Sequence, residues 1–327
     1  MRALVTGATG CVGANIVEAL LDGGYDVRAL HRPTSRLDAL AGLAPELVVG
    51  DVLDESSLRE AMAGCGVVFH AAAMAQYWRQ SPSLLYAVNI VGTRNVLRAA
   101  AASGVERVVL TSSVAALGVP ERDGRPRDES SPFNWAPARF HYGHSKLLAE
   151  AEARRAIAEG LDVVCVNPAT VLGRRDINFV GGEILRAVHR GYAVVAPPGG
   201  MGVVAAEVVG AGHVLAAESG RTGERYILNG ENITHRDLLT LVAAELGRRP
   251  PWLTVPRGVT RLAARLGRAA LQAVRLPPPP LLVQLDLCAR DMYFDGRKAE
   301  RELGLPRIGA RVAVKDAWHW YREHGLL

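Results

Sequence analysis

The sequence predicts an α/β protein of the Rossmann type, a doubly wound parallel sheet with helices on both faces and a smaller C-terminal domain. Two observations carry this prediction. Short apolar strands alternate with amphipathic helices through the first half of the chain, and a glycine-rich turn joins the first strand to the first helix. Strands that are apolar on both faces belong in a parallel sheet covered by helices. We expect residues 1–173 to form the sheet domain and residues 174–327 mainly the smaller one, with the strand near 225–228 returning to the sheet.

Each element follows from its periodicity and its boundary residues. The expected strands are 3–6, 25–31, 46–49, 67–70, 107–111, 162–166 and 225–228. The expected helices are 12–21, 55–63, 82–103, 140–159, 182–191, 208–218 and one that Thr234 caps and that reaches residue 246. An arginine-rich amphipathic segment, 257–275, precedes four prolines at 277–280, which break any helix there. That segment either covers the core or a ligand site, or lies on a membrane surface.

Composition excludes several classes of protein. The 327 residues have a net charge of +5 without a long basic block, so nucleic acid is not an expected partner. Cys11, Cys65, Cys165 and Cys288 lie far apart, and we expect free thiols with neither disulfides nor a metal site. No signal peptide and no apolar stretch of about 20 residues is apparent, so we expect a cytoplasmic protein without an integral membrane segment.

The turn after the first strand carries glycine at 7, 10 and 13, in the stretch Thr6–Gly13. Glycine permits a tight turn and lets a pyrophosphate approach the backbone, and the following helix offers free amide groups at its N-terminus. An ordinary strand-to-helix turn is the alternative. With strand, glycines and helix all in place, the segment predicts a dinucleotide site.

Two further segments bear on the adenosine end of such a cofactor. A site for NAD usually has an acidic residue after the second strand, but here His31 and Arg32 stand there. Arginine suits a 2′-phosphate, so the sequence favours NADP over NAD, unless this is simply a solvated basic loop. Asp51, after the third strand, suits either an adenine contact or a helix cap.

The fourth motif predicts catalysis. Tyr142 and Lys146 are four residues apart on an expected helix and therefore share one face. The chain has only three lysines, which makes a chance pairing improbable. Ser113 follows the fifth strand, at the edge of the sheet where a ligand binds. We expect Tyr142 to be the acid or base, Lys146 to lower its pKa and Ser113 to bind the substrate oxygen. A surface Tyr–Lys pair and a strand that merely ends in serines are the alternatives.

Taken together, these motifs resemble the extended short-chain dehydrogenase/reductases, also called the NAD(P)-dependent epimerase/dehydratase family. The most similar branches are the dihydroflavonol 4-reductase-like and the hopanoid-associated sugar-epimerase-like proteins. The resemblance covers nearly the whole chain, at Thr6–Gly13, Asp51, Phe69–Ala73, Asn89–Thr93, Thr111–Ser113, Tyr142–Lys146, Asn167–Pro168 and Lys298–Gly304. The chain differs from the sugar-nucleotide enzymes of this family at Val204–Val208, which lacks their acidic pattern.

The resemblance implies a role for each matching position. Ser113, Tyr142 and Lys146 would be the catalytic triad. The implied cofactor contacts are Gly7, Thr9, Gly10, Cys11, Val12, Gly13, His31, Arg32, Asp51, Val52, Ala71, Ala72, Ala73, Asn89, Tyr142, Lys146, Pro168 and Thr170. The residues expected near the substrate, unless they are simply core, are Tyr77, Trp78, Phe133, Trp135, Phe179 and Met201.

We therefore expect an NADP-dependent ketone reductase, reversible as an alcohol dehydrogenase, with a fairly hydrophobic small-molecule substrate. One alternative is a sugar or sugar-nucleotide epimerase or dehydratase that holds NAD tightly and returns the hydride within one cycle. Another is a catalytically silent NADP sensor, against which the complete Ser-Tyr-Lys set argues. A homodimer is typical of the resembled family.

Overall fold

Seven parallel strands form the main sheet, as the sequence predicts. The computed structural model describes residues 1–75, 81–121, 125–273 and 280–327. The strands are β1 (Arg2–Thr6), β2 (Asp26–His31), β3 (Glu46–Val49), β4 (Val67–His70), β5 (Arg107–Thr111), β6 (Asp162–Pro168) and β10 (Arg225–Leu228). Their order across the sheet is β10-β6-β5-β4-β1-β2-β3. The strand order reverses between β1 and β4, which places the expected ligand crevice at the carboxyl ends of these two strands.

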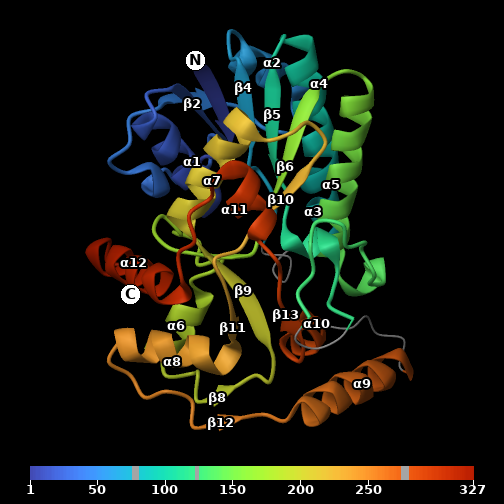
Figure 1. Ribbon diagram of the computed structural model, residues 1–327, viewed down its shortest axis with the longest axis vertical. Coiled ribbons are helices and arrows are strands. Elements are labelled where there is room, and N and C mark those ends of the chain that lie inside the picture. The colour runs from blue at the N-terminus through green and yellow to red at the C-terminus, as the bar shows by residue number, and fades with distance from the viewer. Residues whose placement is uncertain (76–80, 122–124, 274–279) are drawn as a thin grey trace.

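Helices cover both faces of this sheet, because its strands are apolar on both sides (Figure 1). One layer contains α1 (Cys11–Asp22), α7 (Ala206–Ser219) and α11 (Arg297–Leu303). The other contains α2 (Glu55–Met62), α4 (Thr93–Ala102) and α5 (His141–Ala158). Val5 and Phe69 belong to the core on one side of the sheet, and Leu4 and Val68 to the core on the other. The alternation in the sequence is therefore an alternation between two separate cores.

The helix expected over residues 82–103 is interrupted. Pro82–Tyr86 forms α3, and a π-helical turn over Ala87–Gly92 joins it to α4. Gly92 lies so close to α2's preceding loop that an added Cβ would be 2.8 Å from a methyl group of Val52. Inserted π-helical turns often occur at functional sites, and this one presents Asn89 to the site described below.

Short strands in the second half of the chain escape prediction from the sequence. A second sheet contains β7 (Thr170–Leu172), β9 (Gly200–Ala205), β11 (Glu231–Thr234) and β13 (Asp291–Met292), and a ribbon pairs β8 (Val195–Ala196) with β12 (Leu253–Thr254). The helices here are α6 (Glu183–His189), α8 (His235–Glu245), α9 (Arg257–Ala273), α10 (Pro280–Cys288) and α12 (Ala310–Glu323). These strands are too short or too rich in glycine to show the alternation of apolar and polar residues that identifies a strand in a sequence.

Boundary predictions fare better where a side chain caps a helix. The Thr234 hydroxyl accepts a hydrogen bond from the Asp237 amide at 3.1 Å, which confirms Thr234 as the N-cap of α8.

Tyr77, Trp78 and Pro277–Pro279 lie outside the described residues, and Pro280 begins α10. Among the described helices none is long and apolar enough to cross a bilayer.

Candidate active site

The glycine turn after β1 is closed by backbone contacts that leave no room for side chains. Gly7 has a φ of +68°, and a Cβ there would be 2.5 Å from the Ala72 amide nitrogen. A Cβ on Gly13 would be 2.1 Å from the Gly7 carbonyl oxygen. Helix α1 then begins after Gly10 without a side-chain cap and without an acidic residue in its first turn. Its first amide groups are therefore available to a phosphate.

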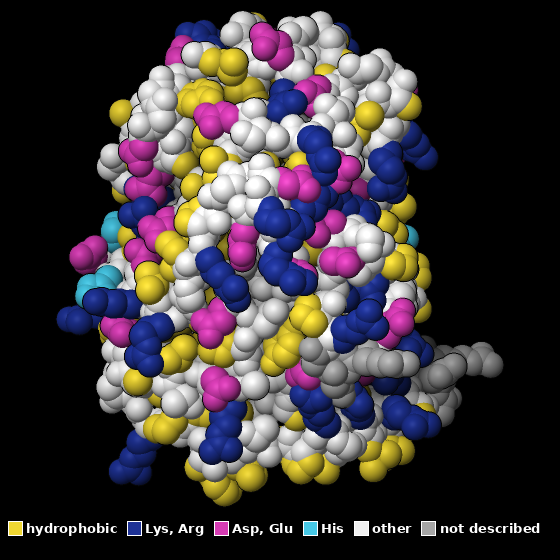
Figure 2. Space-filling view, viewed as in Figure 1, with side chains coloured by type: hydrophobic (Ala, Val, Ile, Leu, Met, Phe, Trp, Pro, Cys, Tyr) yellow, Lys and Arg dark blue, Asp and Glu magenta, His cyan; other side chains and the backbone are white. Residues whose placement is uncertain are grey.

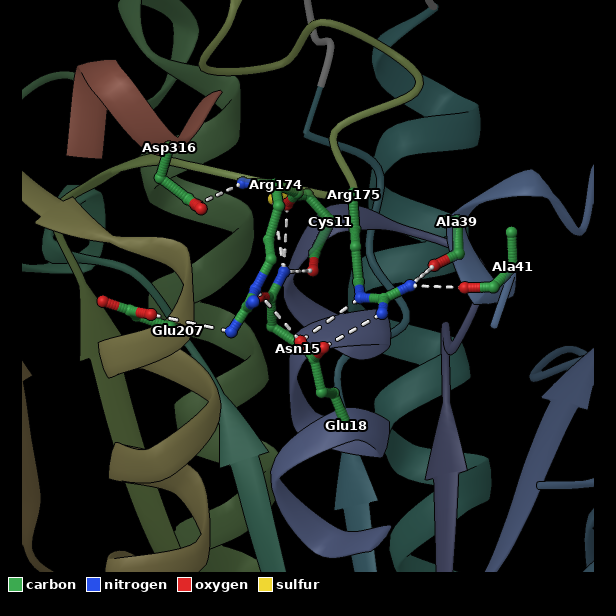
Figure 3. A network of polar contacts seen from close by, with 9 residues as sticks. All are labelled: Cys11, Asn15, Glu18, Ala39, Ala41, Arg174, Arg175, Glu207 and Asp316. Carbon is green, nitrogen blue, oxygen red and sulfur yellow. Dashed lines mark hydrogen bonds and ion pairs between the residues drawn. The ribbon is translucent and has the colours of Figure 1, made fainter. Parts of the chain in front are cut away.

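A polar network fixes α1 against the loop that follows β7 (Figure 3). Glu18 forms ion pairs with Arg174 at 3.2 Å and with Arg175 at 3.0 Å. The Asn15 amide group donates to the carbonyl oxygens of Cys11 at 2.8 Å and of Arg174 at 3.2 Å. The Cys11 thiol also donates to the Arg174 carbonyl, and burial raises the pKa of that thiol. Cys11, at the first position of α1, therefore has an uncharged thiol that is hydrogen-bonded within the protein.

Arg175 extends this network toward the adenosine end. Its guanidinium donates to the carbonyl oxygens of Ala39 at 2.9 Å and of Ala41 at 3.1 Å, in the loop that follows β2. Arg175 adopts a φ of +67°, which is uncommon for a residue with a side chain. The sequence contains no motif that distinguishes Arg174 and Arg175 from the other arginines, so they were not predicted.

The predicted triad is brought together at the carboxyl end of β5. Ser113 caps a short 3-10 helix over Val114–Leu117, and its side chain is hydrogen-bonded to Tyr142. Tyr142 lies in the first turn of α5, and Lys146 lies one turn later, almost fully buried. The Lys146 ammonium donates to the Thr111 carbonyl oxygen at 2.8 Å. All three side chains line one cavity.

The pKa values in this cluster differ from the sequence-based expectation. Burial raises the pKa of Tyr142, and the hydrogen bond to Ser113 opposes this shift. Lys146 is not among the causes of this shift, and its ammonium donates to the Thr111 carbonyl oxygen. Burial in turn lowers the pKa of Lys146 to about 8, although the Glu150 carboxylate favours its charged form. Tyr142 is thus a protonated phenol at neutral pH.

Glu150, which the sequence analysis missed, holds the triad's surroundings in place. It is 1% exposed. One of its oxygens accepts hydrogen bonds from the Ser112 hydroxyl at 2.5 Å and from the Asn167 amide group at 2.8 Å, and the other pairs with Arg225. Asn167 also donates to the Ser113 carbonyl oxygen at 3.0 Å. The sequence did contain a signal for Glu150, because its position one turn after Lys146 places a carboxylate on the same helix face.

Two other polar side chains secure the loops around the triad. Asn89 accepts a hydrogen bond from the Met74 amide at 2.7 Å and donates to the Ser145 hydroxyl at 2.9 Å, so it joins the loop after β4 to α5. The Thr111 hydroxyl is bonded to Nε2 of His213 at 2.8 Å. Burial lowers the pKa of His213 to about 4, so this histidine is a neutral, structural partner of β5.

The cavity measures about 700 Å³ and receives most of the predicted cofactor contacts. Its lining includes Gly7, Gly10, Cys11, Val12, Gly13, Arg32, Ala71, Ala73, Pro168 and Thr170. Thr9, His31, Asp51, Val52, Ala72 and Asn89 are not part of this lining. Among them, Ala72 supports the turn at Gly7 from behind and Asn89 fixes the adjoining loop.

At the adenosine end, Arg32 is exposed and no carboxylate pairs with it among the described residues. Arg36, nearby, is engaged by Asp38 at 3.1 Å. The Asp51 carboxylate accepts a hydrogen bond from the Leu53 amide at 2.9 Å. It does not cap α2, because Asp54 does so through the amides of Ser56 and Ser57.

The other end of the cavity is predominantly apolar. Of the residues expected near the substrate, Met201 lines it. Phe179 instead stacks on Tyr321 at 4.7 Å between ring centroids, and Phe133 and Trp135 pack near α5 outside the lining. The apolar lining here includes Met74, Phe140, Val180, Met201, Leu287, Cys288, Met292 and Phe294.

Polar side chains also line this part of the cavity, among them Asn178, His235 and Gln284. His235, at the start of α8, is 7% exposed and lines the cavity. Its Nε2 atom has no hydrogen-bond partner among the described residues, and burial lowers the pKa of His235 to about 4. It therefore contributes a neutral imidazole. No group of three or more His, Cys, Asp or Glu side chains suited to a metal occurs in the described ranges.

The glycine turn, the buried Tyr–Lys pair and the parallel sheet agree with a family model. The model for the NAD-dependent epimerase/dehydratase family matches residues 3–200. The chain belongs to this family. It is an NAD(P)-dependent oxidoreductase of the extended short-chain dehydrogenase/reductase type, as the sequence analysis predicted.

Individual family members match over the full length. A putative dihydroflavonol 4-reductase of Synechocystis is 40% identical, covering 99% of this chain and 95% of its own. A 4-hydroxy-2-methyl-3-oxo-4-farnesyl-3,4-dihydroquinoline-1-oxide ketoreductase of Stigmatella aurantiaca is 32% identical, covering 99% and 97%. The crystal structure of a nucleoside-diphosphate-sugar epimerase from Pseudomonas aeruginosa superposes with a TM-score of 0.82 at 29% identity, covering 100% and 99%.

Proposed function

We propose that this enzyme is an NADPH-dependent ketone reductase, reversible as an alcohol dehydrogenase, that acts on a fairly hydrophobic carbonyl compound. The observation that carries the proposal is the composition of the cavity. Its lining combines the triad with methionine, leucine, valine and phenylalanine side chains, beside the polar side chains of Asn178, His235 and Gln284. Such an end suits an apolar substrate body, whereas a sugar nucleotide needs many polar partners. The name of the Stigmatella relative, a ketoreductase of a farnesylated quinoline, supports the same class.

The bound cofactor would supply the hydride that attacks the carbonyl carbon. The chain's own residues then handle the proton. Tyr142 donates its phenolic proton to the carbonyl oxygen as that oxygen becomes an alcohol, and the Ser113 hydroxyl positions the same oxygen. A raised pKa keeps Tyr142 protonated at neutral pH, which is the state a proton donor needs. The Lys146 ammonium provides a positive charge one turn away.

The cofactor preference rests on Arg32. It lines the cavity, it is exposed, and the residues around it include no acidic group at the position where a site for NAD usually has one. The glycine turn fits a dinucleotide pyrophosphate, since a Cβ would fill the space at Gly7 and Gly13. A guanidinium in this place suits the 2′-phosphate of NADP.

The decisive experiment replaces the proton donor. In Tyr142→Phe we expect kcat to fall by about 10² to 10⁴-fold, the usual size of a general acid's contribution. The dissociation constant for NADPH, measured by fluorescence titration, should change less than about threefold, because the ring is retained. Tyr25→Phe is the matched control, since Tyr25 is bonded to Glu218 away from the cavity. Unchanged turnover in Tyr142→Phe contradicts the proposal.

The family description itself favours one other candidate. An epimerase or dehydratase would retain its cofactor through purification and return the hydride within one cycle. Cofactor that co-purifies, with no net NADPH consumption across a panel of ketones, would favour that chemistry.

A further inference from the structure

Helix α9 is packed with its charged side inward. Arg257 pairs with Asp291 at 2.5 Å, and Arg268 pairs with Asp286 at 3.0 Å. Arg261 donates to the Ala289 carbonyl oxygen at 3.3 Å. These partners all belong to α10 or to the segment that follows it. The three arginines therefore attach α9 to the rest of the protein.

The opposite side of α9 is apolar and faces solvent. Val259, Leu262 and Leu266 follow helical spacing, and their exposed fractions are 57%, 55% and 61%. An amphipathic helix on the surface of a globular protein normally buries its apolar stripe and exposes its charges. Here the pattern is reversed. An exposed apolar stripe of this kind marks an interaction surface.

Other exposed apolar side chains lie at the same end of the molecule. Trp252 is 70% exposed, and Leu253 beside it pairs with Val195 between β12 and β8. We call this surface the basal face, and its members are Tyr192, Val194, Val195, Trp252, Leu253, Val259, Leu262 and Leu266. Figure 1 places α9, β8 and β12 at the lower end of the molecule, and Figure 2 shows hydrophobic side chains at that end with basic and acidic side chains among them.

The segment that contributes most of this face carries charge of a single sign. Between Glu245 and Asp286 the sequence contains seven arginines and no acidic residue or lysine. The whole protein carries a net charge of only +5, so the rest of the chain is slightly acidic. Arg248, Arg249 and Arg265 are exposed at this end. An apolar surface with exposed tryptophan and leucine, contributed mostly by an acid-free and arginine-rich segment, has the chemistry of a helix that lies in a lipid interface.

We propose that the basal face docks on the surface of an anionic lipid bilayer. The apolar stripe would enter the headgroup region, and the arginines would contact the lipid phosphates. A second copy of this chain fits less well, because a symmetric pair would bring two acid-free, arginine-rich segments together. The face therefore differs from an ordinary dimer interface in its charge.

Docking would also orient the cavity. Helix α10 packs against α9, where the Leu282 side chain contacts Gly267, and it contributes Gln284, Leu287 and Cys288 to the cavity lining. The apolar end of the cavity thus lies next to the element that contacts lipid. This consequence, unlike the docking itself, rests on the proposed function, since it gives a hydrophobic substrate a short path from bilayer to cavity.

The test is sedimentation of the full-length protein with vesicles. We expect binding to vesicles that contain phosphatidylglycerol, little binding to pure phosphatidylcholine, and at least an approximately fivefold loss of binding between about 0.05 and 0.5 M NaCl. The double variant Leu262→Glu/Leu266→Glu should lose binding at least about tenfold, because two carboxylates replace inserted leucines. Leu47→Glu, at an exposed leucine on β3, is the matched control and should bind like the wild type.

Three outcomes would overturn the proposal. The wild type does not sediment with anionic vesicles, or the two kinds of variant bind equally, or the double variant converts a dimer to a monomer by sedimentation velocity. Turnover of a water-soluble ketone without vesicles separates this proposal from the proposed function. In the wild type, turnover without vesicle binding overturns docking alone, and vesicle binding without turnover overturns the reductase alone.

Discussion

The two ends of the cavity are built in different ways. The cofactor end consists of backbone at van der Waals limits and of buried, hydrogen-bonded polar groups, such as Gly13 against Gly7 and Glu150 beneath Ser112. The substrate end consists of apolar side chains from segments far apart in sequence, including Met201 and Phe294. We infer that single substitutions at the cofactor end disturb the whole site, whereas those at the substrate end change which molecules fit.

The largest effect is expected in the glycine turn. In Gly13→Ala the new Cβ would lie 2.1 Å from the Gly7 carbonyl oxygen, so the turn must shift. We expect the free energy of unfolding to fall by about 2 kcal/mol or more and NADPH affinity to fall at least about 100-fold. Calorimetry and fluorescence titration measure the two. Gly10→Ala, whose nearest contact is 3.5 Å, should leave stability nearly unchanged; equal destabilisation in both variants would refute the close-packing argument.

Glu150→Gln tests whether the buried network controls the triad. We expect kcat to fall about tenfold, because Ser112 and Asn167 lose a charged partner. The Glu150 charge raises the pKa of Lys146, which burial lowers to about 8. Without this charge the pKa of Lys146 falls further, so the ammonium is lost at a lower pH. The alkaline limb of the kcat/KM profile should therefore move to lower pH. In Glu159→Gln, an exposed position at the end of α5, the profile should not move; a shift there, or none in Glu150→Gln, contradicts the prediction.

Arg32→Glu tests the adenosine end. A carboxylate there would repel the 2′-phosphate, so we expect the KM for NADPH to rise about 10- to 100-fold while that for NADH changes little. Steady-state kinetics with both cofactors measures this ratio. Arg36→Glu is the control, because Arg36 is already paired with Asp38. An unchanged cofactor ratio in Arg32→Glu would remove the support for NADP.

The smallest effect is expected at the substrate end. Met201→Ala should change the KM for bulky ketones about two- to tenfold and leave cofactor affinity unchanged, because the shorter side chain only enlarges an apolar part of the cavity. Kinetics with ketones of increasing size test this. Phe179→Leu is the counterpart, because Phe179 stacks on Tyr321 in the core. It should lower the melting temperature and leave the KM alone, and the opposite pattern would reverse our assignment of these two residues.

Sequence reasoning locates features that lie within a contiguous segment. The glycine turn and the Tyr142–Lys146 pair lie within single loops or helix turns, so their spacing is visible in the sequence. It does not locate features that depend on tertiary contact. Phe179 and Met201 look equally suitable as apolar pocket residues, and only packing separates them. Arg175 resembles the other arginines until its guanidinium meets Ala39 and Ala41.

The position of β10 has a consequence for how the protein is made. The sheet receives its final strand only after residues 225–228 have been synthesised, and β10 then pairs with β6 from Arg225↔Cys165 to Leu228↔Pro168. A nascent chain that ends at residue 173 would expose β6 as an open edge, which is a template for aggregation. The Arg225–Glu150 ion pair needs the same strand and joins it to α5. Closure of the sheet edge and this ion pair therefore both depend on β10.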